Sequence, residues 1–211
     1  MKKSYLILLA LSSLLVTVFL WGCGSGPGSP GSYGCEDVGL ICDVTLTPTY
    51  KGSNAYSVDA FQQICTAGPP PVYEIFTDHS ATATISLWRL NPNSTFLINP
   101  VYIEKYTIEF RRSTDSIGSP PIQSFTGYQT IVLTPPTGTT INTVDTTVVL
   151  VDLIRKIQYQ TDVLSGRYSF GPAYINNYTA SYIFEGQSMG KAIRIFGQVP
   201  FQIGSFDYCG G

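Results

Sequence analysis

Apolar and polar residues alternate along much of the chain. The clearest stretches span residues 80–90, 102–112 and 174–185. Neighbouring side chains of a β-strand point to opposite faces of a sheet, so this two-residue period predicts strands with one buried and one solvated face. The residues predicted to face the core are Ala81, Ala83, Ile85 and Leu87, then Tyr106, Ile108 and Phe110, and finally Tyr178, Ala180, Tyr182 and Phe184.

Shorter apolar stretches between turn residues predict further strands. They lie at residues 43–50, 128–134, 146–151 and 192–203. Residues 57–65 fit a strand or a helix by their spacing, and we interpret them as a strand because glycine- and proline-containing turns bound them closely.

One segment has the spacing of a helix. Leu153, Ile154 and Ile157 would share a helical face, which predicts a short crossover helix near residues 152–160. The alternative is that the preceding strand continues to Tyr159.

Together these stretches predict an all-β domain of about seven to eight short antiparallel strands. Since each strand has one wet and one dry face, we expect two packed sheets, a β-sandwich. The strand count and a closing hairpin, YTASYIFEGQ followed by KAIRIFGQV, resemble the immunoglobulin and fibronectin type III class of bacterial surface domains. This resemblance spans residues 43–209 and implies an Ig-like β-sandwich. A barrel of the lipocalin kind is the alternative.

The beginning of the chain has a different pattern. Two lysines precede an uncharged apolar run over residues 5–21, and the run ends in Leu20-Trp21-Gly22-Cys23. These are the parts of a bacterial export signal. The final string resembles the lipobox of bacterial lipoproteins, in which the signal is removed just before a cysteine that is then acylated. The resemblance implies a signal peptide over residues 1–22 and a lipidated Cys23, carrying palmitate or a related acyl chain.

Two further inferences concern this anchor. Gly24 follows the cysteine where an aspartate often marks inner-membrane retention, so the family analogy favours the outer membrane. The alternative to a lipoprotein is an uncleaved N-terminal membrane helix, since the apolar run is near the lower limit of about 17 residues for a span.

Residues 24–34 read GSGPGSPGSYG, which is the composition of a flexible linker. Eleven such residues have a mean reach of roughly 17–20 Å. The chain therefore divides into the signal peptide, a tether over residues 23–34 and a single domain over residues 35–211, a length that suits one core better than two.

The charge balance of the chain limits the classes of partner that we expect it to bind. The chain has 12 basic and 14 acidic residues, and loss of Lys2 and Lys3 with the signal leaves 10 against 14. A nucleic-acid-binding protein needs a basic surface to neutralise phosphates, so we expect no nucleic-acid partner. The expected partners are the membrane, through the N-terminal lipid, and a protein or glycan that the sequence does not identify.

Five cysteines are present, and lipidation of Cys23 leaves four in the domain. An even number in an exported domain fits two disulfides. We predict Cys65–Cys209, because Cys65 ends an early strand, Cys209 follows the last one, and such strands often neighbour each other in a sandwich. Cys35 and Cys42 then pair locally. The alternative is Cys42–Cys65 with a free Cys209.

The string GQSMG at residues 186–190 matches the nucleophile motif G-x-S-x-G. That motif requires a strand before the serine, a helix after it and a histidine later in the chain. Here a strand follows, and His79, which is the one histidine, lies upstream. We therefore interpret the string as a hairpin turn.

With one histidine and no C-x-x-C pair, we expect no metal site and no cofactor. His79 is interpreted as a structural residue just before a strand, and a metal ligand together with Asp78 is the alternative. Trp88 lies on the polar phase of its strand, which makes it a candidate surface residue for binding a sugar or protein. The alternative to a binding role is that a loop or helix covers the Trp88 side chain.

These observations favour a membrane-anchored lipoprotein of the bacterial cell envelope, exported to the periplasm or cell surface, that acts as a non-enzymatic binding or structural module. The alternative is a carbohydrate-binding accessory protein or an envelope enzyme with an unrecognised site. Glu104 and Glu109 are too weakly patterned to form an acid/base pair.

Overall fold

The computed structural model describes residues 34–74, 76–168 and 174–209, and it is mostly β. The described residues form one α-helix, α2 (Leu153–Leu164), and two short 3-10 helices, η1 (Cys35–Val38) and η2 (Thr114–Ser116). The long strands are β1 (Leu40–Tyr50), β6 (His79–Arg89), β7 (Val101–Arg112), β8 (Phe125–Leu133), β9 (Asn142–Val151), β10 (Asn176–Ser188) and β11 (Lys191–Gly204). The short strands are β2 (Ser53–Asn54), β3 (Ser57–Asp59), β4 (Ile64–Thr66) and β5 (Val72–Tyr73).

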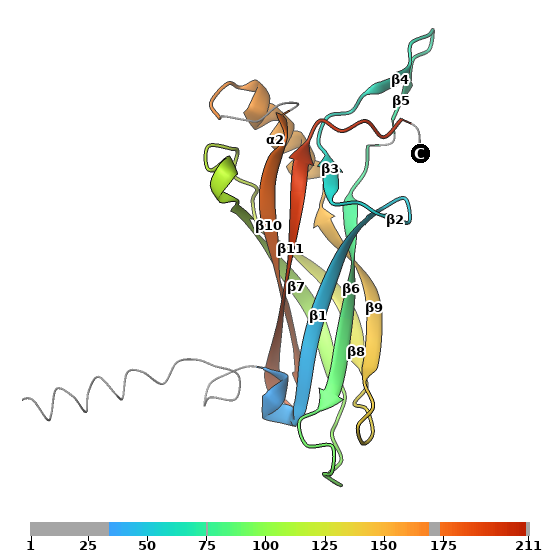
Figure 1. Cartoon of the computed structure of the whole chain (residues 1–211), viewed down its shortest axis with the longest axis vertical. Helices are drawn as coiled ribbons and strands as arrows, with labels where there is room; N and C mark the ends of the chain where they lie inside the picture. The colour runs from blue at the N-terminus through green and yellow to red at the C-terminus, as the bar shows by residue number, and fades with distance from the viewer. Residues whose placement is uncertain (1–33, 75, 169–173, 210–211) are drawn as a thin grey trace, which may run out of the picture.

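The long strands form two sheets (Figure 1). One sheet has four antiparallel strands in the order β2-β1-β6-β9. The other has five strands in the order β3-β11-β10-β7-β8, and it curls into a half-barrel. Its pairs are antiparallel except that β3 runs parallel to β11. The expectation of an antiparallel, mostly β chain is thus confirmed, apart from this one pair.

The core lies between the sheets and is lined by the residues that alternation predicted. Of the eleven named above, ten are buried, and Phe110 packs partly exposed against the same core. Two tyrosines of the five-stranded sheet also form hydrogen bonds with β9, an edge strand of the four-stranded sheet. Tyr182 Oη donates to the carbonyl of Val149, and the N–H of Val149 donates to Tyr106 Oη. Rings that reach a hydrogen-bond partner can be buried without loss, which explains how so aromatic a core is tolerated.

β1 and β11 lie side by side where the sheets meet. A Cβ at Gly197 would lie 2.9 Å from Val44 Cγ1 and 3.0 Å from Leu46 Cδ1. Glycine is therefore required at this close approach of the two sheets.

The last two long strands form the expected hairpin. β10 and β11 pair from Asn176↔Ile203 to Ser188↔Lys191, joined by the two-residue turn Met189-Gly190. Both turn residues have positive φ, 52° and 76°, as in the tight turns that match strand twist. The G-x-S-x-G string thus lies in a β-hairpin and lacks the helix that the catalytic motif requires.

The interpretation of residues 57–65 as one strand is wrong. β3 ends at Asp59, and β4 begins only at Ile64. The break occurs because the Asp59 carboxylate accepts the N–H of Phe61 (3.2 Å), which turns the chain out of the sheet.

The helix predicted near residues 152–160 is confirmed as α2, and the alternative of a strand continuing to Tyr159 is wrong. Asp152 caps its N-terminus by accepting the N–H of Arg155 (2.9 Å). Among the described residues, no helix has the length and apolar character needed to span a membrane.

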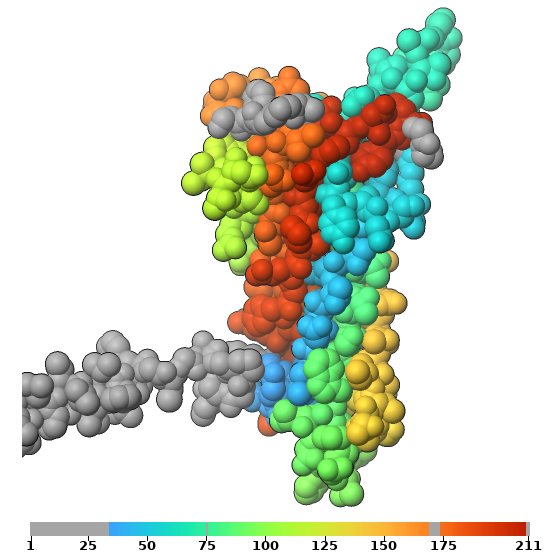
Figure 2. All heavy atoms as spheres, in the orientation of Figure 1, coloured from blue at the N-terminus to red at the C-terminus, as the bar shows by residue number. Residues whose placement is uncertain are grey.

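The strands run lengthwise, so the domain has two distinct ends (Figures 1 and 2). The tether end carries η1, the loops at residues 90–100 and 134–141, and the Met189-Gly190 turn. The tail end carries α2, β3, β4, β5 and the C-terminal segment, which is residues 205–209.

Candidate functional site

Two disulfides link the described cysteines, and both pairings expected from the sequence are confirmed. Cys35 bonds to Cys42 at the start of β1, with their Cα atoms 5.8 Å apart. Cys65 of β4 bonds to Cys209 beyond β11, with a Cα–Cα distance of 5.1 Å. The parallel pairing of β3 with β11 brings these two segments together. Two disulfides are typical of an extracellular or periplasmic protein.

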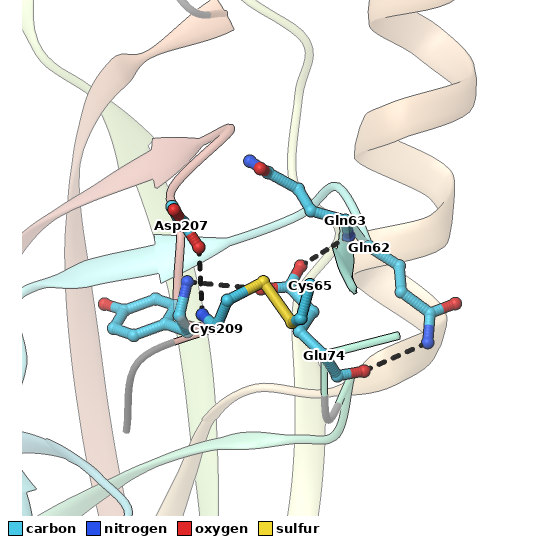
Figure 3. Close-up of a disulfide and its surroundings, with 7 residues drawn as sticks. Gln62, Gln63, Cys65, Glu74, Asp207 and Cys209 are labelled. Carbon is cyan, nitrogen blue, oxygen red and sulfur yellow. Dashed lines mark hydrogen bonds between the residues drawn. A yellow bond between two sulfur atoms is a disulfide. The ribbon is translucent and has the colours of Figure 1, made fainter. Parts of the chain in front are cut away.

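The segment over residues 64–73, here called the arm, projects from the tail end (Figure 2). At its base Glu74 is only 4% exposed. Its Oε1 accepts the N–H of Gln63 (2.7 Å), and its Oε2 accepts the N–H of Tyr208 (3.2 Å). Figure 3 shows this carboxylate beside the Cys65–Cys209 bond. One buried side chain therefore holds the arm and the C-terminal segment together.

Asp59 is a second buried carboxyl group, and it acts in the same way. Its Oδ1 accepts the N–H of Phe206 (2.9 Å) as well as that of Phe61. Burial raises the pKa of Asp59 to about 7, and a hydrogen bond with Glu74 adds to the rise, while the two backbone N–H groups oppose it. Asp59 consequently keeps its proton to a pH close to neutral.

Three rings pack against one another near these carboxyls. Tyr50 lies 5.4 Å from His79 and 4.7 Å from Tyr208 between ring centroids. Tyr208 Oη donates to the carbonyl of Ser57. His79 Nε2 lies 2.8 Å from the carbonyl of Ala55, so this nitrogen carries the proton. Burial lowers the pKa of His79 to about 4, and the ring is neutral at pH 7.

Lys156 of α2 completes the group, although it is 1% exposed. Its Nζ donates to the carbonyl of Thr77 (2.7 Å) and lies 5.1 Å from the ring centre of Phe76. Burial lowers the pKa of Lys156 to about 8, while the negative charges of Asp59 and nearby carboxylates oppose that shift. A buried ammonium is tolerated here because carbonyl, ring and carboxylates replace its water.

We call Asp59, Glu74, His79 and Lys156 the buried charge cluster. A lysine and a carboxyl group with shifted pKa values are the ingredients of proton-transfer chemistry. Here, however, both carboxylates accept backbone N–H groups, and Lys156 and His79 each contact a backbone carbonyl. A substrate would have to displace the chain itself. What this geometry does directly is fasten the arm, the C-terminal segment and α2 to one another.

A metal site at this place is not supported. Glu74, Asp207 and Cys209 are the group of possible ligands that comes close together among the described residues. The sulfur of Cys209 is bonded to Cys65, and Asp207 Oδ1 accepts the N–H of Cys209 (2.9 Å). Two carboxylates that already accept backbone N–H groups make a poor cation site.

Of the residues singled out from the sequence as candidate site residues, Trp88 lies away from the buried charge cluster and His79 lies within it. Trp88 is half-buried on the outward phase of β6, opposite Ile41 of β1. His79 belongs to the cluster as the first residue of β6, in keeping with its structural interpretation. Cys23 lies outside the described residues.

Charged groups on the outer face of the five-stranded sheet form a surface network. Glu185 pairs with Lys105 (2.9 Å) and Arg194 (2.8 Å), and Gln187 donates to Glu104 (2.8 Å). The hydrogen bond from Lys105 is the main cause that lowers the pKa of Glu185. All of these side chains have protein partners, which suits a structural role. Glu109 is exposed on the same strand as Glu104.

Sequence reasoning missed Asp59, Glu74 and Lys156. Their signal was weak, because each is a single charge in a different segment. The nearest clue was Lys156, which lies between apolar positions of α2 on the face that also buries Tyr159 and Val163.

Comparisons with known proteins place the chain in no family. No family model matches it, and no curated protein matches it. Among solved structures, it is similar to a protein of Archaeoglobus fulgidus with a TM-score of 0.40 and 5% identity over 78% of this chain and 97% of the other.

Proposed function

We propose that the protein is a membrane-anchored lipoprotein of the bacterial cell envelope and acts there as a non-enzymatic binding or structural module. The observation that carries this proposal is the distribution of cysteines. Cys35, Cys42, Cys65 and Cys209 pair among themselves. The fifth, Cys23, is thereby left for acylation, and it stands where the lipobox resemblance requires it.

The arm is the part that we propose meets a partner. Ile64, Val72 and Tyr73 are each about half exposed on it. The disulfide and Glu74 fix its base, so its apolar side chains are presented without the entropy cost of ordering a free loop. It projects from the end of the domain opposite η1 (Figure 1). A protein or a glycan fits this surface.

For the architecture, we propose an immunoglobulin-like β-sandwich. The support is the pair of sheets with facing buried rows, for example Ala83 and Ile85 on β6 and Ala180 and Tyr182 on β10. The parallel β3–β11 pair and the half-barrel curl depart from that architecture.

The test of the anchor is metabolic labelling with palmitate. The wild-type chain should incorporate label, and Cys23→Ser should abolish it and accumulate a precursor of higher mass. Cys209→Ser serves as the control that removes a different cysteine and should keep the label. An unlabelled wild-type chain would refute the lipoprotein and leave a plain signal anchor.

The alternative is an envelope enzyme, and the buried charge cluster is the observation that favours it. A hydrolase panel and a glycan array on the purified chain separate the classes. Turnover that Lys156→Met abolishes would establish the enzyme and overturn the proposed function. Glycan binding without turnover would define the module as carbohydrate-binding.

A further inference from the structure

The tether end displays large apolar side chains on its loops. The exposed fractions are 82% for Phe96, 87% for Leu97, 79% for Met189, 64% for Ile141 and 52% for Leu90. These residues come from the 90–100 loop, the 134–141 loop and the β10–β11 turn, which we call the tether-end loops.

Hydrogen bonds hold the tether-end loops against one another. Leu90 N–H donates to the carbonyl of Gly39 beside η1 (3.0 Å), and Asn99 Nδ2 lies 2.9 Å from Met189 Sδ. Arg89 donates to the carbonyl of Pro136 through Nε (2.9 Å) and to that of Ser94 through Nη1 (2.8 Å). The apolar tips are thus parts of one fixed face.

The long loops of this face are uncharged, while η1 beside them carries Glu36 and Asp37 and the strand after the turn begins with Lys191. Residues 90–100 and 134–141 contain no acidic or basic residue. At the tail end, the exposed Ile154 and Ile157 of α2 lie on either side of the charged Arg155, whereas the arm exposes Ile64, Val72 and Tyr73 and is uncharged like the tether-end loops. A face of apolar tips on uncharged loops suits the headgroup–acyl boundary of a bilayer, where desolvating a charge would be costly.

The position of the face matches that environment. The described chain begins at Gly34, immediately before η1, around which the tether-end loops gather (Figures 1 and 2). Cys23 precedes Gly34 by eleven residues, a mean reach of roughly 17–20 Å for a linker of this composition. An acyl chain on Cys23 would hold this end of the domain next to the lipid.

We propose that the tether-end loops insert Phe96, Leu97 and their apolar neighbours into the surface of the bilayer that holds the lipid anchor. This inference rests on the proposed lipid anchor. The domain then stands upright on the membrane, with the arm pointing away from it, and does not tumble on its linker. Two contacts, one lipid and one loop-borne, hold the protein more firmly than either alone.

The test places an environment-sensitive NBD fluorophore on Leu97→Cys in the full, acylated chain. The chain is reconstituted in vesicles of phosphatidylethanolamine and phosphatidylglycerol that contain lipids with a nitroxide on the acyl chain. Tyr73→Cys, on the arm, carries the same label as the matched control. We expect a blue shift and nitroxide quenching at position 97 and neither at position 73.

Each outcome decides between occupants. Unchanged emission at position 97 in a chain that carries palmitate overturns the inference and leaves the proposed anchor standing. A blue shift without quenching, growing with the protein-to-lipid ratio, would assign the face to a second copy of the chain and also overturn it. If palmitate is absent, the proposed function fails separately, and quenching at position 97 in vesicle-bound chain still supports insertion.

Discussion

The two ends of the domain are fastened by opposite means. At the tail end, Glu74 accepts backbone N–H groups from Gln63 and Tyr208, which are far apart in sequence. At the tether end, Arg89 donates to backbone carbonyls that include Ser94 and Phe96, only a few residues away. The tail end is therefore held by buried and titratable groups, and the tether end by a permanently charged one, which also donates to the carbonyl of Pro136. A change of pH should thus act mainly on the tail end.

The largest expected difference between the two ends is in the stability that each disulfide contributes. Cys65 and Cys209 are 144 residues apart and Cys35 and Cys42 only 7. Serine at both tail-end positions should lower the free energy of unfolding by about 5 kcal/mol, and serine at both tether-end positions by about 2 kcal/mol, because a longer loop restricts the unfolded chain more. Urea unfolding of the two double variants measures both, and equal losses would contradict the contrast.

The second effect concerns pH. A carboxyl group whose pKa is raised on folding contributes stability that is complete below its unfolded pKa of about 4 and is lost as pH rises through its folded value. For Asp59 that folded value is about 7. Asp59→Asn keeps the oxygen that accepts from Phe61 and Phe206 but cannot ionise. The melting temperature of the variant, relative to the wild type, should rise steadily from pH 4 to pH 7.

A control and a counter-result define this experiment. Asp43→Asn changes an exposed carboxylate and should show no such trend. His79, whose pKa is lowered to about 4, adds stability as pH rises from 4 to 6.5, but it does so in the wild type and both variants alike. A constant offset between Asp59→Asn and the wild type across this range would show that Asp59 ionises normally.

The smallest expected losses of stability are those on replacing Glu74 at the tail end and Arg89 at the tether end. Glu74→Ala leaves two partly buried N–H groups without this acceptor and should cost about 2 kcal/mol, with faster hydrogen exchange at both Gln63 and Tyr208. Glu74→Gln, which keeps one oxygen, should cost less. Arg89→Met should raise exchange only within residues 91–97 and the 134–141 loop, with a loss of about 1 kcal/mol. Exchange spreading to the opposite end in either variant would show that the ends are coupled.

Much of the fold could be predicted from the sequence because one face of each long strand is solvent-exposed and the other is buried, which makes apolar and polar residues alternate. The rows that begin at Ala81 and Tyr178 alternate for that reason, and the structure buries them as expected. The cysteine pairing also followed, since removing Cys23 left few combinations and the last strand had to lie near an early one.

The candidate site could not be predicted, because its members contact one another only through the tertiary fold. Asp59 and Glu74 sit in short, irregular segments, and Lys156 is more than eighty residues further along. Each alone has the pattern of an ordinary surface charge. The broken strand after Asp59 was missed for the same reason, since the side chain that breaks it is held in place by the C-terminal segment through Phe206.

The antiparallel pairing of β1 with β6 has a mechanical consequence. The chain enters β1 at Leu40 after η1, and ten register pairs connect this strand to β6, from Leu40↔Arg89 to Thr49↔Ser80. Their hydrogen bonds run perpendicular to the strands. A pull between the tether and a partner held by the arm would be directed along the strands, so it would shear the ladder and load its bonds together, whereas a sideways pull would open them one by one. The domain is thus built to bear tension along its own length.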